Sequence, residues 1–339
     1  MGSAGPNSTD DHGESSQIAA DYGRLSPDLV LDAIDSTGLR ADGRLMALNS
    51  FENRVYQVGI EDDGFRVAKF YRPNRWSDEA IDEEHRFTLA LAEADIPVTP
   101  PLALNGRTTN TYEGYRFAVF PRQGGREPEL ESAENLAWLG RSIGRMHSVG
   151  RRVHLDHRRR LLDADRVAEA SRLVLTLEFV PPHLVQSHEA TCQAILEHIR
   201  MRFDFAEAGW MQAIHGDLHR GNVLWTEEGP HFVDFDDCVT GPAVADFWML
   251  LDGDPEARAG QLEILLEGYE QFMDFDRFQL VLIEALRAAR MIEYAAWIAQ
   301  RWDDPAFPAS FPWFGQPRFW EEHVSNLNEQ LARLATPTG

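Results

Sequence analysis

The spacing of hydrophobic and polar residues changes about a third of the way along the chain. From Gly43 to Pro121 the apolar residues fall mostly in short runs that turn residues separate, a pattern typical of strands. Beyond Pro121 they recur mainly every three or four residues over longer stretches, which is typical of amphipathic helices. The pattern predicts an α+β protein whose first part is an antiparallel sheet with one main helix and whose second part is mainly helical.

The first part should contain three strands, one helix and then two or three more strands. A short helix opened by Ser26-Pro27-Asp28 precedes them. Asp63-Gly64 is a strong hairpin signal, and the main helix should run from about Ser77 to Ala94 and end before Pro97. The expected strands are 45–50, 54–60, 65–71, 102–104, 108–112 and 115–120.

The second part should be built from helices around one strand-rich segment. Helices are expected from near Ser132 and over 245–251, 261–272 and 278–301. In the last of these, Arg287, Arg290, Tyr294 and Trp297 are spaced three or four apart. The Pro- and aromatic-rich stretch 304–314 is too apolar to face water throughout, so it should pack on this part. We interpret His147 as structural and the run Arg158-Arg159-Arg160 as a solvated face.

The strand-rich segment runs from Gln212 to Asp237 and reads QAIHGDLHRGNVLWTEEGPHFVDFDD. Apolar runs at 223–225 and 231–233 flank the turn-rich residues 226–230, which predicts a short hairpin. With the turn centred near Glu228, Val223 pairs with Val233. Asn222 then lies opposite Asp234.

This arrangement predicts three oxygen-bearing side chains near one another. Asn222 and Asp234 could share one hard cation, and Asp217 lies five residues before Asn222. Phosphoryl transfer from Mg²⁺-ATP needs such a set, because it needs an oriented hydroxyl and neutralised phosphate charge. Two alternatives remain open: a polar loop that matches by chance, and a zinc site formed by His215 and His219.

The segment His215-Gly216-Asp217-Leu218-His219-Arg220-Gly221-Asn222 resembles the H-G-D-x-x-x-x-N catalytic loop of aminoglycoside-phosphotransferase-like kinases. Phe232-Val233-Asp234 is similar to the metal-binding segment that follows this loop. The resemblance implies a two-lobed protein-kinase-like fold, with Asp217 and Asp234 as catalytic residues and Asn222 and Asp234 as metal ligands. It divides the chain from residue 23 onward into an N-lobe over 23–121 and a C-lobe over 122–335. Residues 1–22 are rich in Gly, Ser, Asp and Asn with few large apolar residues, which predicts a disordered tail.

In the same kinases a lysine on the third strand contacts the nucleotide phosphates, and Lys69 occupies that place. A lysine within an apolar strand needs a partner, and the expected one is Glu84. Glu84 shares a helix face with Ile81, Phe87 and Leu91, whereas Glu83 does not. The alternative is that Lys69 and Glu84 are ordinary surface charges.

Three further positions should meet the nucleotide. The turn between Leu48 and Tyr56 contains no glycine, so side chains would have to replace the backbone contacts of a Gly-rich loop. Ser50, at the end of the first strand, is the first candidate, before Asn53 and Arg54. The backbone groups of Val119 and Phe120 should be free to meet an adenine edge.

Asp246, in Asp246-Phe247-Trp248, is similar to the aspartate that braces the catalytic loop in this superfamily. A plain carboxylate at a helix N-terminus is the alternative.

Four segments, 48–56, 69–73, 117–121 and 304–308, resemble the bacterial stress response kinase A family, over about Leu25 to Trp320. That resemblance implies a Ser/Thr protein kinase that acts under stress on protein substrates. Two other functions stay open: a kinase of small-molecule hydroxyls, and a pseudokinase that binds nucleotide without turnover.

Composition limits which partners the protein can have and in which cellular compartment it is expected. The chain has 339 residues, 43% of them hydrophobic, and two cysteines, which suits a reducing compartment. It contains no apolar run near 18 residues and no signal-peptide pattern. The net charge of −23 disfavours nucleic acid and anionic membranes. We therefore expect a soluble, cytoplasmic protein. We also expect it to be a monomer.

Overall fold

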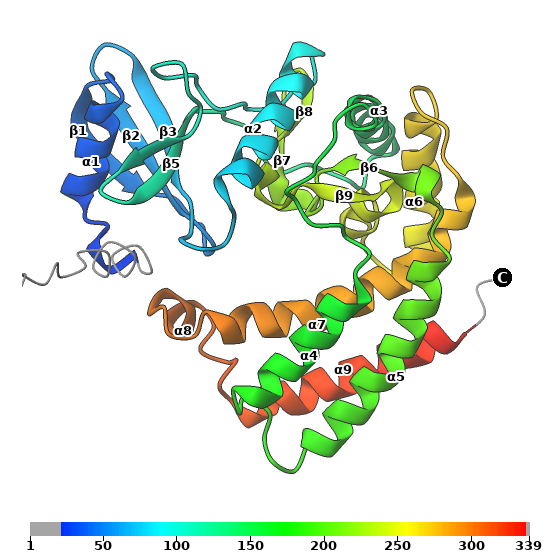
Figure 1. The fold of residues 1–339 in the computed structure, drawn as a ribbon. Coiled ribbons are helices and arrows are strands. Elements are labelled where there is room, and N and C mark those ends of the chain that lie inside the picture. The colour runs from blue at the N-terminus through cyan, green and yellow to red at the C-terminus, as the bar shows by residue number, and fades with distance from the viewer. Residues whose placement is uncertain (1–21, 337–339) are drawn as a thin grey trace, which may run out of the picture. The chain divides into compact units, whose positions relative to one another are not determined.

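The computed structural model describes residues 22–336, which form two compact units (Figure 1). The first unit comprises the described residues up to Asp82 together with Pro101–Arg122, and the second comprises Glu83–Pro100 and the residues from Gln123 onward. The tail predicted over 1–22 lies outside the described residues except for Tyr22. That residue is buried, and its hydroxyl donates to the carbonyl of Phe70 at 2.9 Å, so the tail prediction is wrong for Tyr22.

The first unit is built on a five-stranded antiparallel sheet of order β1-β2-β3-β5-β4. Its strands are β1 (Ala41–Ala47), β2 (Arg54–Ile60), β3 (Gly64–Phe70), β4 (Asn110–Tyr112) and β5 (Tyr115–Pro121). The strand expected over 102–104 does not form; this segment has only an isolated bridge between Leu104 and Arg107, across a turn in which Asn105 and Gly106 have positive φ.

Helix α1 (Pro27–Ser36) completes the core of this unit. It begins where predicted, since the Ser26 hydroxyl accepts the amide of Leu29 at 3.2 Å and caps the helix. Val30 and Ile34 on its inner face are fully buried, in one cluster with the sheet residues Phe70 and Phe117. The helix is therefore held on the sheet by apolar packing.

The chain passes from one unit to the other within helix α2 (Asp78–Glu93). From Glu83 onward the helix packs in the second unit, where the ring of Phe87 meets Phe235 edge to face at 5.7 Å. The expectation that Glu83 faces away from the interior is wrong. Glu83 is buried, and its carboxylate accepts the backbone amides of Asp156, His157 and Arg158 at 2.7–3.0 Å. These hydrogen bonds offset the cost of removing the charge from water.

The second unit is mainly helical, as predicted. Helices α4, α5, α7 and α9 pack against one another, and α3 packs against α6 (Figure 1). The helices are α3 (Ala133–Gly150), α4 (Ala164–Thr176), α5 (Val185–Asp204), α6 (Pro255–Tyr269), α7 (Ile283–Gln300), α8 (Ala306–Ser310) and α9 (Pro317–Ala335). The two short sheets are β6 (Met211–Ile214) with β9 (Val239–Pro242), and β7 (Val223–Thr226) with β8 (Gly229–Phe232). Of the helices described, none is long and apolar enough to span a membrane.

Glycines bring α3 and α6 into backbone contact. A Cβ atom on Gly140 would lie 2.0 Å from the carbonyl oxygen of Leu265, and one on Gly268 would lie 2.2 Å from that of Ala137. Side chains at these positions would force the helices apart. The close approach sets His147, near the end of α3, against Tyr269 of α6, with the ring nitrogen Nδ1 3.2 Å from the Tyr hydroxyl.

Two expectations for this unit have different outcomes. The helix predicted over 245–251 is instead two 3₁₀ turns, Ala243–Asp246 and Trp248–Leu250. The aromatic stretch packs as expected, because Phe307, Phe311 and Phe314 are buried.

Stability should fall on acidification because His323 is buried in the neutral form. Burial, with a smaller contribution from His188, lowers the pKa of His323 from 6.5 to about 4, and its Nε2 has no hydrogen-bond partner among residues 22–336. The stabilisation is complete above pH 6.5 and is lost as the pH falls toward 4, because only the unfolded chain then binds the proton. It amounts to about 3 kcal/mol.

Urea unfolding between about pH 7 and about pH 4.5 measures this loss. His323→Gln should show a weaker pH dependence than the parent chain. The control His183→Gln, whose side chain is exposed, should keep the parent dependence. An unchanged pH dependence in His323→Gln would contradict the assignment.

Candidate active site

The hairpin β7–β8 forms as predicted, but its register differs by one residue. Val223 pairs with Phe232 rather than Val233, and Thr226 pairs with Gly229. The turn is tighter than expected because Gly229 adopts φ 98° and the Thr226 hydroxyl donates to its carbonyl at 3.0 Å. The predicted Asn222–Asp234 opposition is therefore wrong. Asn222 lies opposite Val233, whose amide donates to its carbonyl at 3.1 Å.

The buried side chain of Asp246 holds the loop that carries Asp217. The buried Asp246 carboxylate accepts the amide of His215 at 2.8 Å and that of Gly216 at 2.9 Å. The same carboxylate lies 3.0 Å from Nε2 of His147. The brace predicted for Asp246 is thus present, and the structural interpretation of His147 is confirmed.

The His215 ring links this loop to the residue before Asp234. Its Nε2 donates to the carbonyl of Val233 at 2.9 Å, and its Nδ1 lies 3.4 Å from the amide of Asp217. Nε2 carries the proton that it donates and Nδ1 faces a backbone amide, and within the described range 22–336 no three His, Cys, Asp or Glu side chains gather around His215 and His219 to hold a metal. The zinc alternative is therefore wrong.

Asp217 lies between two cationic or potentially cationic side chains. Nη1 of Arg290 is 2.8 Å from Oδ1, and Nε2 of His219 is 3.6 Å from Oδ2. Burial alone would raise the pKa of Asp217, but the hydrogen bond from His219 and the charge of Arg290 outweigh it, so the pKa lies below its ordinary value. Asp217 is therefore ionised at neutral pH.

Asn222 lies at the end of this loop, and Asp234 follows Val233, whose carbonyl accepts from the His215 ring. Nδ2 of Asn222 donates to the carbonyl of Asp217 at 2.9 Å, which orients the amide and leaves its oxygen as the group that can bind a cation. Asp234 adopts φ 61° and ψ 66°, so the chain turns sharply after the hairpin. One amide and one carboxylate fit Mg²⁺, which commonly takes one or two protein ligands besides substrate phosphates and water. Among the described residues no three His, Cys, Asp or Glu side chains gather to hold a metal.

Glu84 is buried in the second unit beside an arginine that we expected on the surface. Nη2 of Arg158 lies 3.0 Å from Oε2 of Glu84, and both side chains are nearly inaccessible. Arg158 also donates to the carbonyl of Asp236. The interpretation of Arg158 as a solvated surface charge is therefore wrong, because its buried guanidinium connects α2 to the residues after Asp234.

The other predicted nucleotide residues belong to the first unit. Lys69 lies on β3, paired with Val55 and Ala118, and is 7% exposed. Its Nζ lies 5.1 Å from the centre of the Tyr71 ring. The proposed pairing of Lys69 with Glu84 stays a prediction.

Ser50 lies in an irregular segment, because β1 already ends at Ala47, so its placement at a strand end is wrong. The two other candidates of that turn make contacts within the first unit. The Asn53 side chain accepts the amide of Arg72 at 3.1 Å, and the Arg54 guanidinium lies over the ring of Tyr22.

The hinge prediction needs one correction. The carbonyl of Val119 accepts the amide of Leu102 at 2.7 Å, so it is not free as we expected. Phe120 continues β5 opposite Val67. Their contact with adenine stays a prediction.

Sequence reasoning missed Arg290 as a neighbour of Asp217. The three- and four-residue spacing along 278–301 indicated that Arg290 shares a helix face with Arg287, Tyr294 and Trp297. Nothing in that spacing says which loop the face meets.

Comparisons with known proteins agree with this geometry. The sequence model of the phosphotransferase enzyme family matches residues 45–283. Stress response kinase A of Escherichia coli K12 is 41% identical over 317 residues, which covers 92% of this chain and 94% of that protein. The serine/threonine protein kinase RdoA of Salmonella typhimurium LT2 is 40% identical over 315 residues, with the same coverage.

Solved structures of other kinases share the fold. An amicoumacin kinase in complex with AMP-PNP, Ca²⁺ and Ami superposes with a TM-score of 0.66 at 18% identity, over 92% of this chain and 96% of that chain. A microcompartment-associated aminopropanol kinase gives 0.68 at 17% identity, over 91% and 99%. These likenesses confirm the predicted α+β, kinase-like fold class.

Proposed function

The chain belongs to the phosphotransferase enzyme family and to its stress response kinase A group, and on that premise we propose that it is an ATP- and Mg²⁺-dependent Ser/Thr protein kinase. The observation that carries the proposal is Asp217, ionised and next to Asn222, on a loop that Asp246 fixes from the interior. The protein substrate is supported by the description of the Salmonella relative as a serine/threonine kinase.

The chain's own residues would perform transfer mainly by positioning. Asp217 holds the acceptor hydroxyl, whose oxygen attacks the γ-phosphorus while the bond to the β–γ bridging oxygen breaks and ADP leaves. The hydroxyl proton passes to Asp217. A carboxylate with a lowered pKa is a weak base, but in a loose transition state orientation matters more than basicity.

Asn222 and Asp234 would hold the divalent cation, which when bound neutralises charge on the nucleotide phosphates. Lys69 of the first unit would contact the α- and β-phosphates, with Glu84 as its predicted partner. Ser50, Val119 and Phe120 would complete the nucleotide contacts. These assignments rest on matching positions in the family motif.

The setting we propose is cytoplasmic and monomeric, with neither nucleic acid nor membrane as a partner. The net charge of −23 supports the last two points because it repels polyanions. A bacterial stress response is the role that the names of the relatives suggest.

Incubation with γ-labelled ATP, with and without Mg²⁺, tests the proposal. We expect label on a generic protein acceptor such as myelin basic protein, and its loss when Mg²⁺ is chelated. Label only on added small hydroxylated compounds would replace the protein substrate by a small molecule. Nucleotide binding without ADP release would instead indicate a pseudokinase.

A further inference from the structure

Arg290 is a cation placed directly at the acid that would orient the acceptor. Its Nη1 is 2.8 Å from Oδ1 of Asp217, without the alignment of a hydrogen bond. In the part of the chain that the structure describes, this is the one ion pair found for Arg290. The side chain is 45% exposed, so a ligand can reach the guanidinium.

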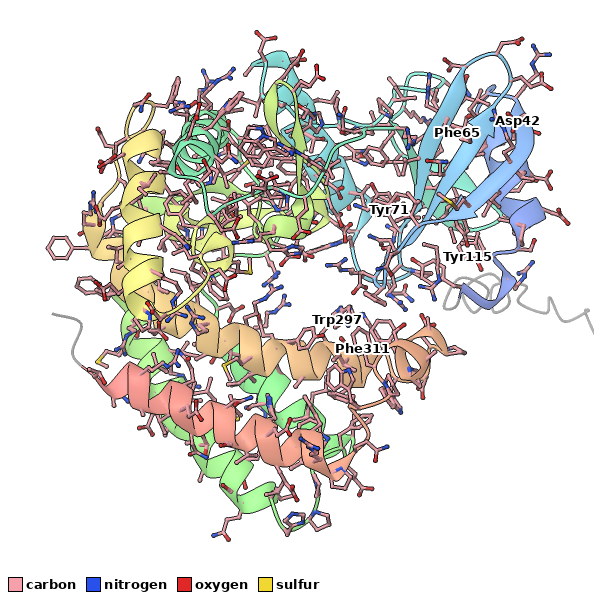
Figure 2. The ribbon with its side chains drawn as sticks, turned by 180° about the vertical axis from the view of Figure 1, so that it is seen from behind. Asp42, Phe65, Tyr71, Tyr115, Trp297 and Phe311 are labelled. Carbon is pink, nitrogen blue, oxygen red and sulfur yellow. The ribbon has the colours of Figure 1, made fainter. Side chains whose placement is uncertain are left out.

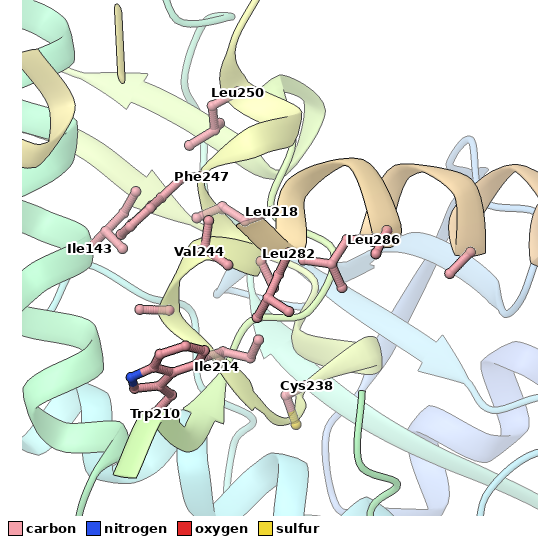
Figure 3. Close-up of a cluster of buried hydrophobic side chains, with 14 of the residues drawn as sticks. Ile143, Trp210, Ile214, Leu218, Cys238, Val244, Phe247, Leu250, Leu282 and Leu286 are labelled. Atoms are coloured by element: carbon pink, nitrogen blue, oxygen red, sulfur yellow. The ribbon is translucent and has the colours of Figure 1, made fainter. Parts of the chain in front are cut away.

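The position of Arg290 is fixed by the core beneath it. Leu218, next to Asp217, is fully buried in the same cluster as Leu282 and Leu286 (Figure 3). Leu286 and Arg290 are four residues apart on α7 and therefore share one helix face. The packing that holds α7 against the catalytic loop thus also sets Arg290 beside Asp217.

The neighbouring arginine on the same helix has a different role. Arg287 lies over the ring of Trp248 at 5.1 Å and within 3.5 Å of Glu284, and it is less exposed than Arg290. Its charge is used inside the fold. Arg290 instead presents an accessible cation in a protein whose net charge is strongly negative.

An aromatic surface continues from Arg290 along α7. Tyr294 is 41% exposed and stacks on Trp297, with ring centroids 5.7 Å apart. Trp297 packs in turn against Phe311, and Figure 2 shows these two rings side by side. The surface therefore combines one positive charge at Asp217 with flat, partly exposed rings farther along the helix.

We propose that Arg290 is a specificity residue that binds an anionic side chain flanking the acceptor hydroxyl, so that the preferred substrate is a Ser or Thr next to an Asp or Glu. Tyr294 and Trp297 would pack on apolar groups of the same peptide. This inference rests on the proposed function and names its substrate class. A carboxylate that binds Arg290 also competes for the guanidinium and frees Oδ1 of Asp217 for the hydroxyl, whereas a neutral peptide leaves that oxygen paired.

The test uses two series of serine peptides. Within each series one flanking position is substituted at a time, with Asp in the first series and with Asn at the same positions in the second. With the full chain and Mg²⁺-ATP, kcat/KM should favour the best Asp peptide by about tenfold or more, mainly through KM, as expected for a charge-assisted hydrogen bond. Arg290→Gln should remove this preference while still phosphorylating the Asn series. Arg290→Lys should retain part of it.

The matched control is Arg277→Gln. Arg277 has the same exposed fraction, 45%, and its Nη1 lies 2.6 Å from Oε1 of Glu263 on α6. Because its partner is Glu263 and not Asp217, the loss of Arg277 should leave the acidic preference intact. A wild-type enzyme without acidic preference overturns the inference, as does an Arg290→Gln enzyme that keeps it or loses activity equally on both series.

Failure of the proposed function can be told apart from failure of the Arg290 inference. Wild-type enzyme that labels no protein or peptide at all overturns both proposals, and this result is seen before any variant is made.

Discussion

Asp217→Ala is expected to lower the rate of phosphoryl transfer by about 10²- to 10⁴-fold, the range typical of a general acid or base. The carboxylate is the group placed to orient the acceptor hydroxyl and take its proton. The amide of Asn222 would keep its contact with the backbone carbonyl of residue 217. Nucleotide affinity should therefore stay within a small factor of the parent value, and the effect should appear in kcat.

Single-turnover labelling of a protein acceptor measures the rate, and calorimetric titration with a non-hydrolysable nucleotide measures the affinity. The variant should remain folded, since Arg290 is nearly half exposed and can turn its charge to water. Asp165→Ala removes an exposed carboxylate of the same unit that pairs with Arg200 of α5 and should behave as the parent enzyme. Transfer retained in Asp217→Ala would show that this residue is not the acceptor-side acid.

The parts of the site that the sequence predicted are those set by local spacing. Asp217 and Asn222 are five residues apart, and a hydrogen bond joins the amide of Asn222 to the backbone of Asp217. The hairpin that follows was also predicted, but its register was not. A turn with Gly229 at positive φ shortens the loop, and one residue of difference moves every cross-strand pair.

The missed contacts join segments far apart in sequence. Arg158 belongs to a run of three arginines that usually indicates a solvated face, yet it is buried against Glu84. Glu83 looked exposed by helical periodicity, although it binds three amides of a distant loop. Periodicity reports which side of a helix is apolar, and it does not register a charge whose burial is compensated by partners elsewhere.

The same reasoning gives Asp246 the largest expected effect on stability. Asp246→Ala should lower the free energy of unfolding by about 3–5 kcal/mol, the cost of removing one partner from a buried charged contact. The substitution leaves the buried amide of His215, the partly buried amide of Gly216 and the ring of His147 without their acceptor. Such unmet donors carry a full desolvation penalty.

Urea unfolding of the full chain measures the loss, and Asp254→Ala provides the scale. The Asp254 carboxylate accepts a single amide, that of Ala257, at the exposed start of α6, and losing such a cap costs about 1 kcal/mol. Asp246→Ala should exceed this severalfold, whereas equal costs would mean that Asp246 is an ordinary helix-end carboxylate. Asp246→Asn, which keeps the shape and one acceptor oxygen, should be less destabilised yet still slow in transfer. That outcome would separate the positioning of the Asp217 loop from the stability of the fold.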